Sequence, residues 1–189
     1  MKRFASALLI LTAVLGGVSP LAAQQNRTSP HETISRVIDG NRITIVYGRP
    51  YSKNPKGDDI RKIWGGLVPY GQIWRTGADE ATLLITQQPI VLGDTTVPAG
   101  AYTLWTLPAE DGTAKLIVNK QIGQWGRKMG SQSIYDESLD VVRVDLKKDP
   151  LETTVGQFTM VIANNPAGGG VLKLQWDNTQ FSVPFTVKK

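Results

Sequence analysis

The sequence predicts an all-β protein built as a single antiparallel β-sandwich, and a jelly roll is one arrangement that fits the pattern. Three observations lead to this prediction. Apolar and polar residues alternate with a period of two along most of the chain. Turn-forming glycine, proline, asparagine and aspartate residues recur between these stretches. No long window shows the period of an amphipathic helix, so helix is expected only as a short turn near 60–64 or 131–139.

The individual strands follow from the alternation. It is clearest at 181–187, where four apolar residues face one way and Pro184 faces the other. Because proline cannot donate a hydrogen bond to a neighbouring strand, Pro184 is expected at the edge of a sheet. The other alternating stretches are 43–47, 102–107, 114–118, 142–146, 158–162 and 172–176, and the turn signals are 39–41, 93–94, 98–100, 110–112, 149–150 and 164–170.

Residues 1–23 have the organisation of a secretory signal peptide. Two cationic residues precede an apolar run at 8–18, and two alanines complete a small-residue cleavage site. Residues 24–33 are predicted to be a polar lead-in, and 34–189 a single domain. The expected location is the periplasm or the cell exterior, with no membrane span after cleavage. An uncleaved membrane anchor is the alternative.

Composition excludes several classes of function. The chain has no cysteine, which rules out disulfides and a lipid-modified N-terminal cysteine. The net charge falls from +5 to +3 without residues 1–23, which carry two cations and no acid, and no Lys/Arg run is present, so nucleic acid is not an expected partner. There is no phosphate-binding loop, zinc signature, calcium loop or nucleophile elbow, so no cofactor or metal is expected. His31, the only histidine, is expected in a solvated loop.

The stretch from Arg61 to Thr82 concentrates rings, cations and glycines. Aromatic rings offer flat surfaces, and guanidinium groups bind carboxylates and phosphates in a planar fork. Two later corners each carry another tryptophan, and the loops of a sandwich gather at its two ends. We therefore expect one pocket for a sugar-like or anionic ligand, formed by Arg49, Arg61, Lys62, Trp64, Trp74, Arg75, Glu80, Trp105, Lys120 and Trp125.

Two other interpretations stand beside this pocket. The plainer one is that the rings are core residues and that the arginines pair with Asp79 or Glu80. The other is acid–base chemistry, since glycoside hydrolysis needs two carboxyl groups about 5 Å or about 6.5–9.5 Å apart. Neighbouring residues of a strand point to opposite faces, so Asp79 and Glu80 meet this condition only in a turn.

Five stretches together resemble the DUF2911 family of exported bacterial proteins of unassigned function. They are YGRPY (47–51), RKIWGGLVPYGQIWRTGADEAT (61–82), VPAGAYTLWTLP (97–108), LIVNKQIGQWG (116–126) and LKLQWDNTQFSVPF (172–185). The resemblance covers about residues 30–187 and implies a secreted β-rich domain, with no established activity, cofactor or catalytic residue. Asp79 stands where the family more often has asparagine, and 52–59 and 127–135 are longer than the usual links.

Three functions remain open from the sequence. The first is a non-enzymatic binding module, in which rings stack on a sugar, Arg61 and Arg75 hold an anionic group, and Glu80 orients an arginine or accepts a hydroxyl. The second is a hydrolase or lyase acting on cell-envelope polysaccharide, with Glu80 or Asp79 as acid or base and Tyr70 assisting. The third is a structural or partner-binding envelope domain, in which the ring-rich stretch is buried or covers a flat apolar patch.

Overall fold

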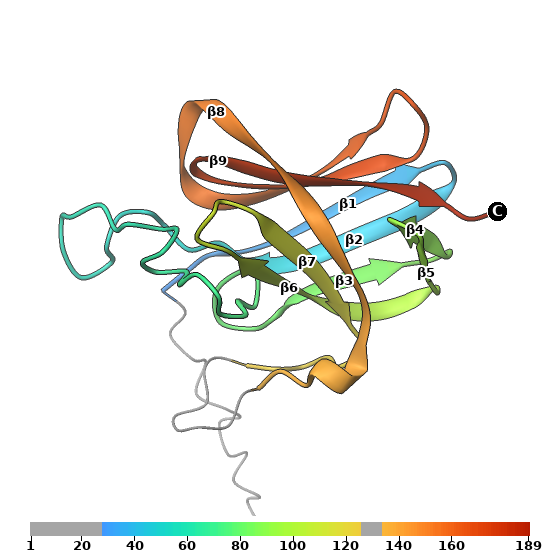
Figure 1. Ribbon diagram of the computed structural model, residues 1–189, viewed down its shortest axis with the longest axis horizontal. Helices are drawn as coiled ribbons and strands as arrows, with labels where there is room; N and C mark the ends of the chain where they lie inside the picture. Colours follow the sequence, from blue (N-terminus) through green and yellow to red (C-terminus); the bar gives the residue numbers. More distant parts are fainter. Residues whose placement is uncertain (1–27, 126–133) are drawn as a thin grey trace, which may run out of the picture.

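The computed structural model describes residues 28–125 and 134–189, which form an antiparallel all-β fold (Figure 1), so the predicted fold class is confirmed. The strands are β1 (His31–Ile38), β2 (Asn41–Gly48), β3 (Thr82–Thr86), β4 (Ile90–Leu92), β5 (Thr95–Val97), β6 (Gly100–Pro108), β7 (Ala114–Asn119), β8 (Asp140–Asn164) and β9 (Gly170–Val187). One turn of 3-10 helix, η1 (Glu137–Leu139), lies within the 131–139 stretch where a helical turn is predicted. The described residues include no helix with the length and apolar character needed to cross a membrane.

The nine strands form one open sheet in the order β1-β2-β3-β6-β7-β8-β9-β4-β5, and all neighbours are antiparallel. β8 is 25 residues long and changes partner along its length. Its first part, 140–146, pairs with β7, and from Lys147 onward it pairs with β9. The strand therefore passes from one layer of the sandwich to the other (Figure 1). The order is a meander with one displaced hairpin, β4–β5, which is simpler than a jelly roll.

The β1–β2 hairpin fixes the position of His31. Its turn consists of Asp39 and Gly40, whose φ angles of 47° and 83° are both positive, as a tight two-residue hairpin requires. The register runs back from this turn to the pair His31↔Gly48 at the open end. The first strand therefore begins inside the predicted lead-in, 24–33, and His31 lies beside the end of β2.

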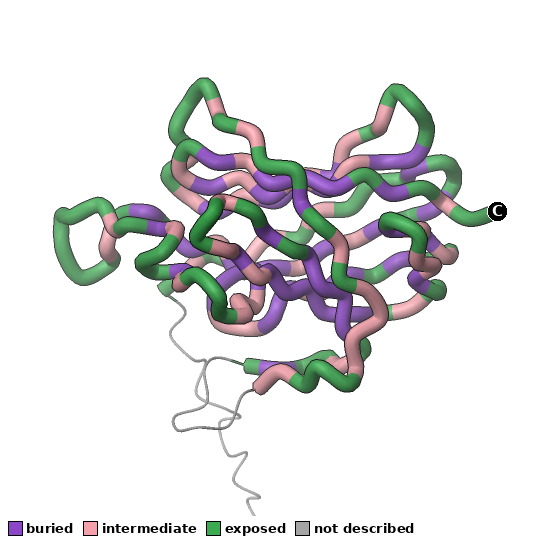
Figure 2. The backbone as a smooth tube through the Cα atoms, viewed as in Figure 1, coloured by how far each residue is buried: buried purple, intermediate pink, exposed green. Residues whose placement is uncertain are grey.

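The main core lies between the two layers, where the central strands are buried (Figure 2). β8 and β9 supply four of its rings, Phe158, Trp176, Phe181 and Phe185, and Tyr47 and Tyr102 add two more. A second, smaller cluster contains Trp105 and lies apart from the first. Successive residues of a strand point to opposite faces, which explains why Leu104 belongs to the main core and its neighbour Trp105 does not.

The connection between β2 and β3, residues 49–81, closes one end of the sandwich. Trp74 and Thr106 on β6 exchange two backbone hydrogen bonds of 2.8 Å, which ties the connection to the sheet. Trp74 then stacks on Trp176, with ring centroids 5.8 Å apart and 24° between the planes. Trp64 meets Trp74 edge to face at 6.1 Å. The connection thus adds two rings to the core, while other parts of it project from the sandwich as exposed loop (Figures 1 and 2).

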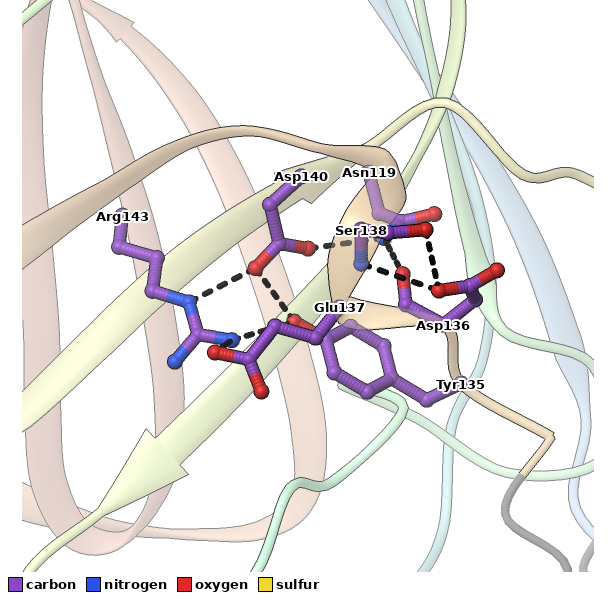
Figure 3. Close-up of polar contacts among 7 residues, drawn as sticks. All are labelled: Asn119, Tyr135, Asp136, Glu137, Ser138, Asp140 and Arg143. Carbon is purple, nitrogen blue, oxygen red and sulfur yellow. Dashed lines mark hydrogen bonds and ion pairs between the residues drawn. The ribbon is translucent and has the colours of Figure 1, made fainter.

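A polar network anchors the chain ahead of β8 (Figure 3). The Tyr135 hydroxyl donates to Asp140 at 2.5 Å, and Arg143 Nε and Asn119 Nδ2 donate to the same carboxylate at 2.7 and 2.8 Å. Burial, followed by Asp140, raises the pKa of the Tyr135 hydroxyl above its ordinary value, so this group stays a proton donor. Its ring lies 5.1 Å from that of Trp105. The network therefore covers Trp105 and has a structural role.

Tyr47 is expected to make the stability of the fold depend on pH in the alkaline range. Burial is the main cause that raises the pKa of its hydroxyl from 10.0 to about 12, and Glu32, which accepts its proton at 2.8 Å, adds to the effect. A pKa raised in the folded state stabilises the fold below the unfolded value, and this contribution is lost as pH rises through the folded value. We expect the free energy of unfolding to fall between pH 10 and about 12, as measured by urea denaturation alongside tyrosinate absorbance.

Tyr47→Phe is the control for this prediction, because it keeps the ring in the core and removes the titrating group. Its unfolding free energy should change less over the same pH interval than that of the wild type. An equally steep fall in both proteins would contradict the role given to Tyr47.

Candidate functional site

Three polar side chains converge where β1 begins and the 49–81 connection ends. His31 Nε2 lies 3.1 Å from Asp79 Oδ2 and 3.3 Å from Glu80 Oε2. One ligand atom from each of the three residues lies within 4.8 Å of the other two. The side chains are 18%, 24% and 35% exposed in the order His31, Asp79, Glu80. We call these three residues the acid–histidine cluster; it is reachable from solvent and partly sheltered.

The backbone at Asp79 explains how two consecutive carboxylates meet one imidazole. Its φ is 63°, in the left-handed region that aspartate and asparagine adopt more readily than most residues. A residue in this conformation interrupts the alternation of a strand, so Asp79 and Glu80 need not point to opposite faces. The turn condition under which the sequence allows them to act together is therefore met.

Contacts on both sides hold the acidic pair in place. The Ala78 N–H donates to Gly48 O at 3.2 Å, and Gly48 is the strand partner of His31. A Cβ added to Gly48 would lie 2.2 Å from the Ala78 oxygen, so only glycine allows this approach without displacement. On the other side, the Ala81 N–H donates to Gln124 O at 3.0 Å. The acid–histidine cluster therefore rests on backbone fixed to β2 on one side and to the segment that follows β7 on the other.

Hydrogen bonds between buried threonines also hold the segment that leads to Asp79. The hydroxyls of Thr76 and Thr106 lie 2.8 Å apart, and the Thr82 hydroxyl donates to Thr76 O at 2.6 Å. Thr76 also has a positive φ of 55°, which is uncommon for a β-branched residue. These hydrogen bonds stabilise an unfavourable backbone conformation three residues before Asp79.

Trp125 stands directly opposite Glu80 in an antiparallel bridge. Opposite residues in such a bridge direct their side chains to the same face, with Cβ atoms about 4.5–5.5 Å apart. Of the five tryptophans, all of which lie in the described residues, only Trp125 is exposed, at 39%. An accessible indole therefore shares a face with the acid–histidine cluster.

The comparisons with known proteins concern this whole fold. A family model described as "Protein of unknown function (DUF2911)" matches residues 29–185. The chain belongs to the DUF2911 family. The match begins just before β1 and ends within β9, so it includes the acid–histidine cluster and Trp125. No curated protein and no solved structure matches the chain.

In this DUF2911 domain, the tryptophans predicted to form a single pocket lie in different places. Trp64 and Trp74 are partly buried and pack against the main core, where both contact Trp176. Trp105 is 2% exposed and lies in the second cluster, under Tyr135. The expectation that the indoles of Trp64, Trp74, Trp105 and Trp125 meet in one open basin is therefore wrong. The physical reason is that three of these rings are used for packing, and the alternation of β6 sends Trp105 away from the main core.

Two of the predicted cations serve the fold. Arg49 donates to Phe158 O at 3.1 Å and to the Thr159 hydroxyl at 2.8 Å, and it pairs with Glu32 at 3.1 Å. Arg61 donates to the Tyr51 carbonyl oxygen within the connection. Both guanidinium groups therefore fasten the 49–81 connection, and neither is presented alone to an anion.

The other predicted residues are spread around the domain. Lys62 and Lys120 are exposed, and Arg75 is half-buried with its carbonyl accepting from the Thr82 N–H at 3.1 Å. Two of the ten predicted site residues, Glu80 and Trp125, are paired in the candidate site, where they face each other across a β-bridge.

His31 is the functional candidate that the sequence analysis missed. It is predicted in a solvated loop, but it is the first residue of β1 and contacts both carboxylates. A signal was present: counting back across the tight turn at Asp39-Gly40 places His31 opposite Gly48. The position of Asp79, 48 residues further along the chain, had no such local signal.

Proposed function

We propose that this chain is an exported, non-catalytic domain that binds a neutral sugar on the face shared by Trp125 and the acid–histidine cluster. The observation that carries the proposal is the Glu80–Trp125 bridge, which directs the one exposed indole to the same face as Glu80, a member of the acid–histidine cluster. Sugar rings have flat C–H faces that stack on an aromatic ring, and carboxylates accept hydrogen bonds from hydroxyl groups.

A neutral ligand fits better than an anionic one. Two carboxylates at the site repel a negative charge, while Arg61, one of the two arginines expected to hold an anionic group, donates to the Tyr51 carbonyl oxygen. The sugar half of the sequence-based hypothesis is therefore kept, and the anionic half is set aside. Export is supported by the arrangement of residues 1–23, which lie outside the described part of the chain.

The test is a binding screen by isothermal titration calorimetry with chito-, cello- and malto-oligosaccharides and with oligogalacturonate as the acidic probe. We expect a neutral oligosaccharide to bind and Trp125→Ala to weaken this binding by about 1–3 kcal/mol, the range found when a ring that stacks on a nucleic-acid base is removed. Tyr51→Ala is the matched control, because Tyr51 is an equally exposed ring, at 42%, outside this site.

Three results would overturn the proposal: no binding of any neutral probe, equal binding by wild type and Trp125→Ala, or a loss of equal size in Tyr51→Ala. Binding of oligogalacturonate alone would also contradict it, since that outcome requires a cationic site.

A hydrolase is the second candidate, because an oxygen of Asp79 and an oxygen of Glu80 lie no more than 4.8 Å apart, and retaining glycosidases use two carboxyl groups that lie near each other, about 5–5.5 Å apart. It predicts that incubation with the bound oligosaccharide releases new reducing ends and that Glu80→Gln stops this release while leaving binding measurable. Binding without release would favour the non-catalytic domain.

A further inference from the structure

We infer that His31, Asp79 and Glu80 together bind one divalent transition-metal ion, with Zn²⁺ as the test case. The sequence alone predicts no metal, because the imidazole and the carboxylates come from segments 48 residues apart and follow no metal-binding motif. The inference concerns the acid–histidine cluster by itself and does not depend on sugar binding.

The separations of the donor atoms match a coordination sphere. Two ligand atoms that each lie about 2.0–2.1 Å from a tetrahedral Zn²⁺ are about 3.3 Å apart. His31 Nε2 lies 3.1 Å from the Asp79 oxygen and 3.3 Å from the Glu80 oxygen. The two carboxylate oxygens complete the triangle within 4.8 Å. Two of the three separations therefore already match those of ligands on one tetrahedral ion.

The chemistry of the three donors indicates the class of metal. Calcium and magnesium prefer sites made entirely of oxygen, whereas an imidazole nitrogen suits zinc and its neighbours in the first transition row. The two carboxylates neutralise the charge of a divalent ion, and the neutral imidazole adds a nitrogen ligand. Three protein ligands also leave one tetrahedral position for water.

The backbone brings the donors together without the ion. Gly48 holds both its strand partner His31 and, through the Ala78 N–H, the residue before Asp79. The Ala81 hydrogen bond to Gln124 fixes the chain just after Glu80. A site organised in this way loses little conformational entropy when it binds a ligand, which distinguishes it from acidic side chains that are merely neighbours on a surface.

The first experiment uses the wild-type protein stripped with a chelator. Calorimetric titration should show one equivalent of Zn²⁺ bound and weak or no binding of Ca²⁺. Because His31 is the only histidine, its imidazole NMR signals need no assignment by mutation, and they should shift with the same titration. Absence of Zn²⁺ binding, or binding that leaves the imidazole signals in place, would overturn the inference.

The second experiment removes one carboxylate at a time. Glu80→Gln and Asp79→Asn keep the size of the side chain, and asparagine also accepts the left-handed backbone at 79. Loss of an outer-shell partner alone lowers metal affinity by roughly 10- to 100-fold. Because Asp79 and Glu80 are direct ligands in this proposal, each substitution should lower the affinity for Zn²⁺ by at least that much. Asp58→Asn is the control, since that carboxylate is fully exposed on the connection and pairs only with Lys53 among the ion pairs of the described residues.

Unchanged Zn²⁺ affinity in both variants would also overturn the inference, and the wild-type imidazole signals give an answer even if a variant fails to fold. Sugar titrations with and without chelator keep the two proposals apart. Sugar binding with no Zn²⁺ binding refutes the metal site alone, and Zn²⁺ binding with no sugar binding refutes only the proposed function.

Discussion

Trp176→Ala is expected to lower the free energy of unfolding by about 3–5 kcal/mol, the cost of removing a fully enclosed large ring. Trp176 is 0% exposed and contacts three other rings, with Trp74 stacked on it at 5.8 Å and Phe158 at 5.7 Å. Its removal leaves a cavity where the connection meets β8 and β9. Since domains of this size are stable by only about 5–15 kcal/mol, the loss is a large part of the total.

The measurement is urea denaturation followed by far-ultraviolet circular dichroism. Trp125→Ala is the matched control, because it removes the same side chain from the surface and should cost no more than about 0.5 kcal/mol. If Trp176→Ala does not fold, Trp176→Phe gives a smaller loss in the same direction. Equal stability of Trp176→Ala and Trp125→Ala would contradict the division of the tryptophans into core and site.

Gly48→Ala is expected to be the most damaging small change near the candidate site. The added Cβ would lie 2.2 Å from the Ala78 oxygen, and a backbone atom cannot move aside as a flexible side chain does. Overpacking of this kind costs about 1–3 kcal/mol, and sometimes more. Relief requires the 76–80 segment to move away from β2, which separates Asp79 and Glu80 from His31.

Gly156→Ala controls for the loss of a glycine, because a Cβ at that position meets nothing within 4 Å. We expect it to leave stability and Zn²⁺ binding close to wild type, while Gly48→Ala lowers both. The readouts are urea denaturation and calorimetric Zn²⁺ titration of the folded protein. Equal behaviour of the two variants would show that the close contact between Gly48 and Ala78 does not hold the acid–histidine cluster.

Local patterns were enough to predict the class of fold. The alternation at 43–47 and 172–176 reflects burial of one strand face, whereas both faces are buried over 116–118, and each of these stretches lies in a strand. Pro184 is predicted on an edge strand, but β9 lies between β8 and β4 in the sheet. Its pairing with β8 ends at Ser182, and beyond that residue the described pairing is with β4 only. The missing N–H of proline is thus tolerated where one side of the strand has been left by its neighbour.

The candidate site was predicted only in part, for a physical reason. Aromatic rings are equally suited to packing in a core and to binding a ligand. The sequence around Trp64, Trp74 and Trp105 therefore does not distinguish these packed rings from the exposed Trp125. What separates them is burial, which depends on where the 49–81 connection docks on β6 and β8. That docking joins residues far apart in the chain, and no period or turn signal encodes it.

The role of His31 was missed for the same reason, because it depends on contacts between distant parts of the chain. Its strand is mostly exposed, so β1 lacks the apolar alternation that marked the other strands. Only the hairpin register places His31 at Gly48, and only the left-handed backbone at Asp79 brings both carboxylates to it. Sequence reasoning recognised the acidic pair and the turn it needed, but not the partner.

Sugar binding at Trp125 is tested most directly by NMR, following the five indole N–H signals during titration with the oligosaccharide that binds best. Each signal is assigned with a single Trp→Phe variant. We expect the Trp125 signal to shift strongly, while those of Trp74, Trp105 and Trp176 stay in place. Shifts confined to Trp64 and Trp74, with Trp125 unmoved, would place the ligand at the end of the core and contradict the proposed site.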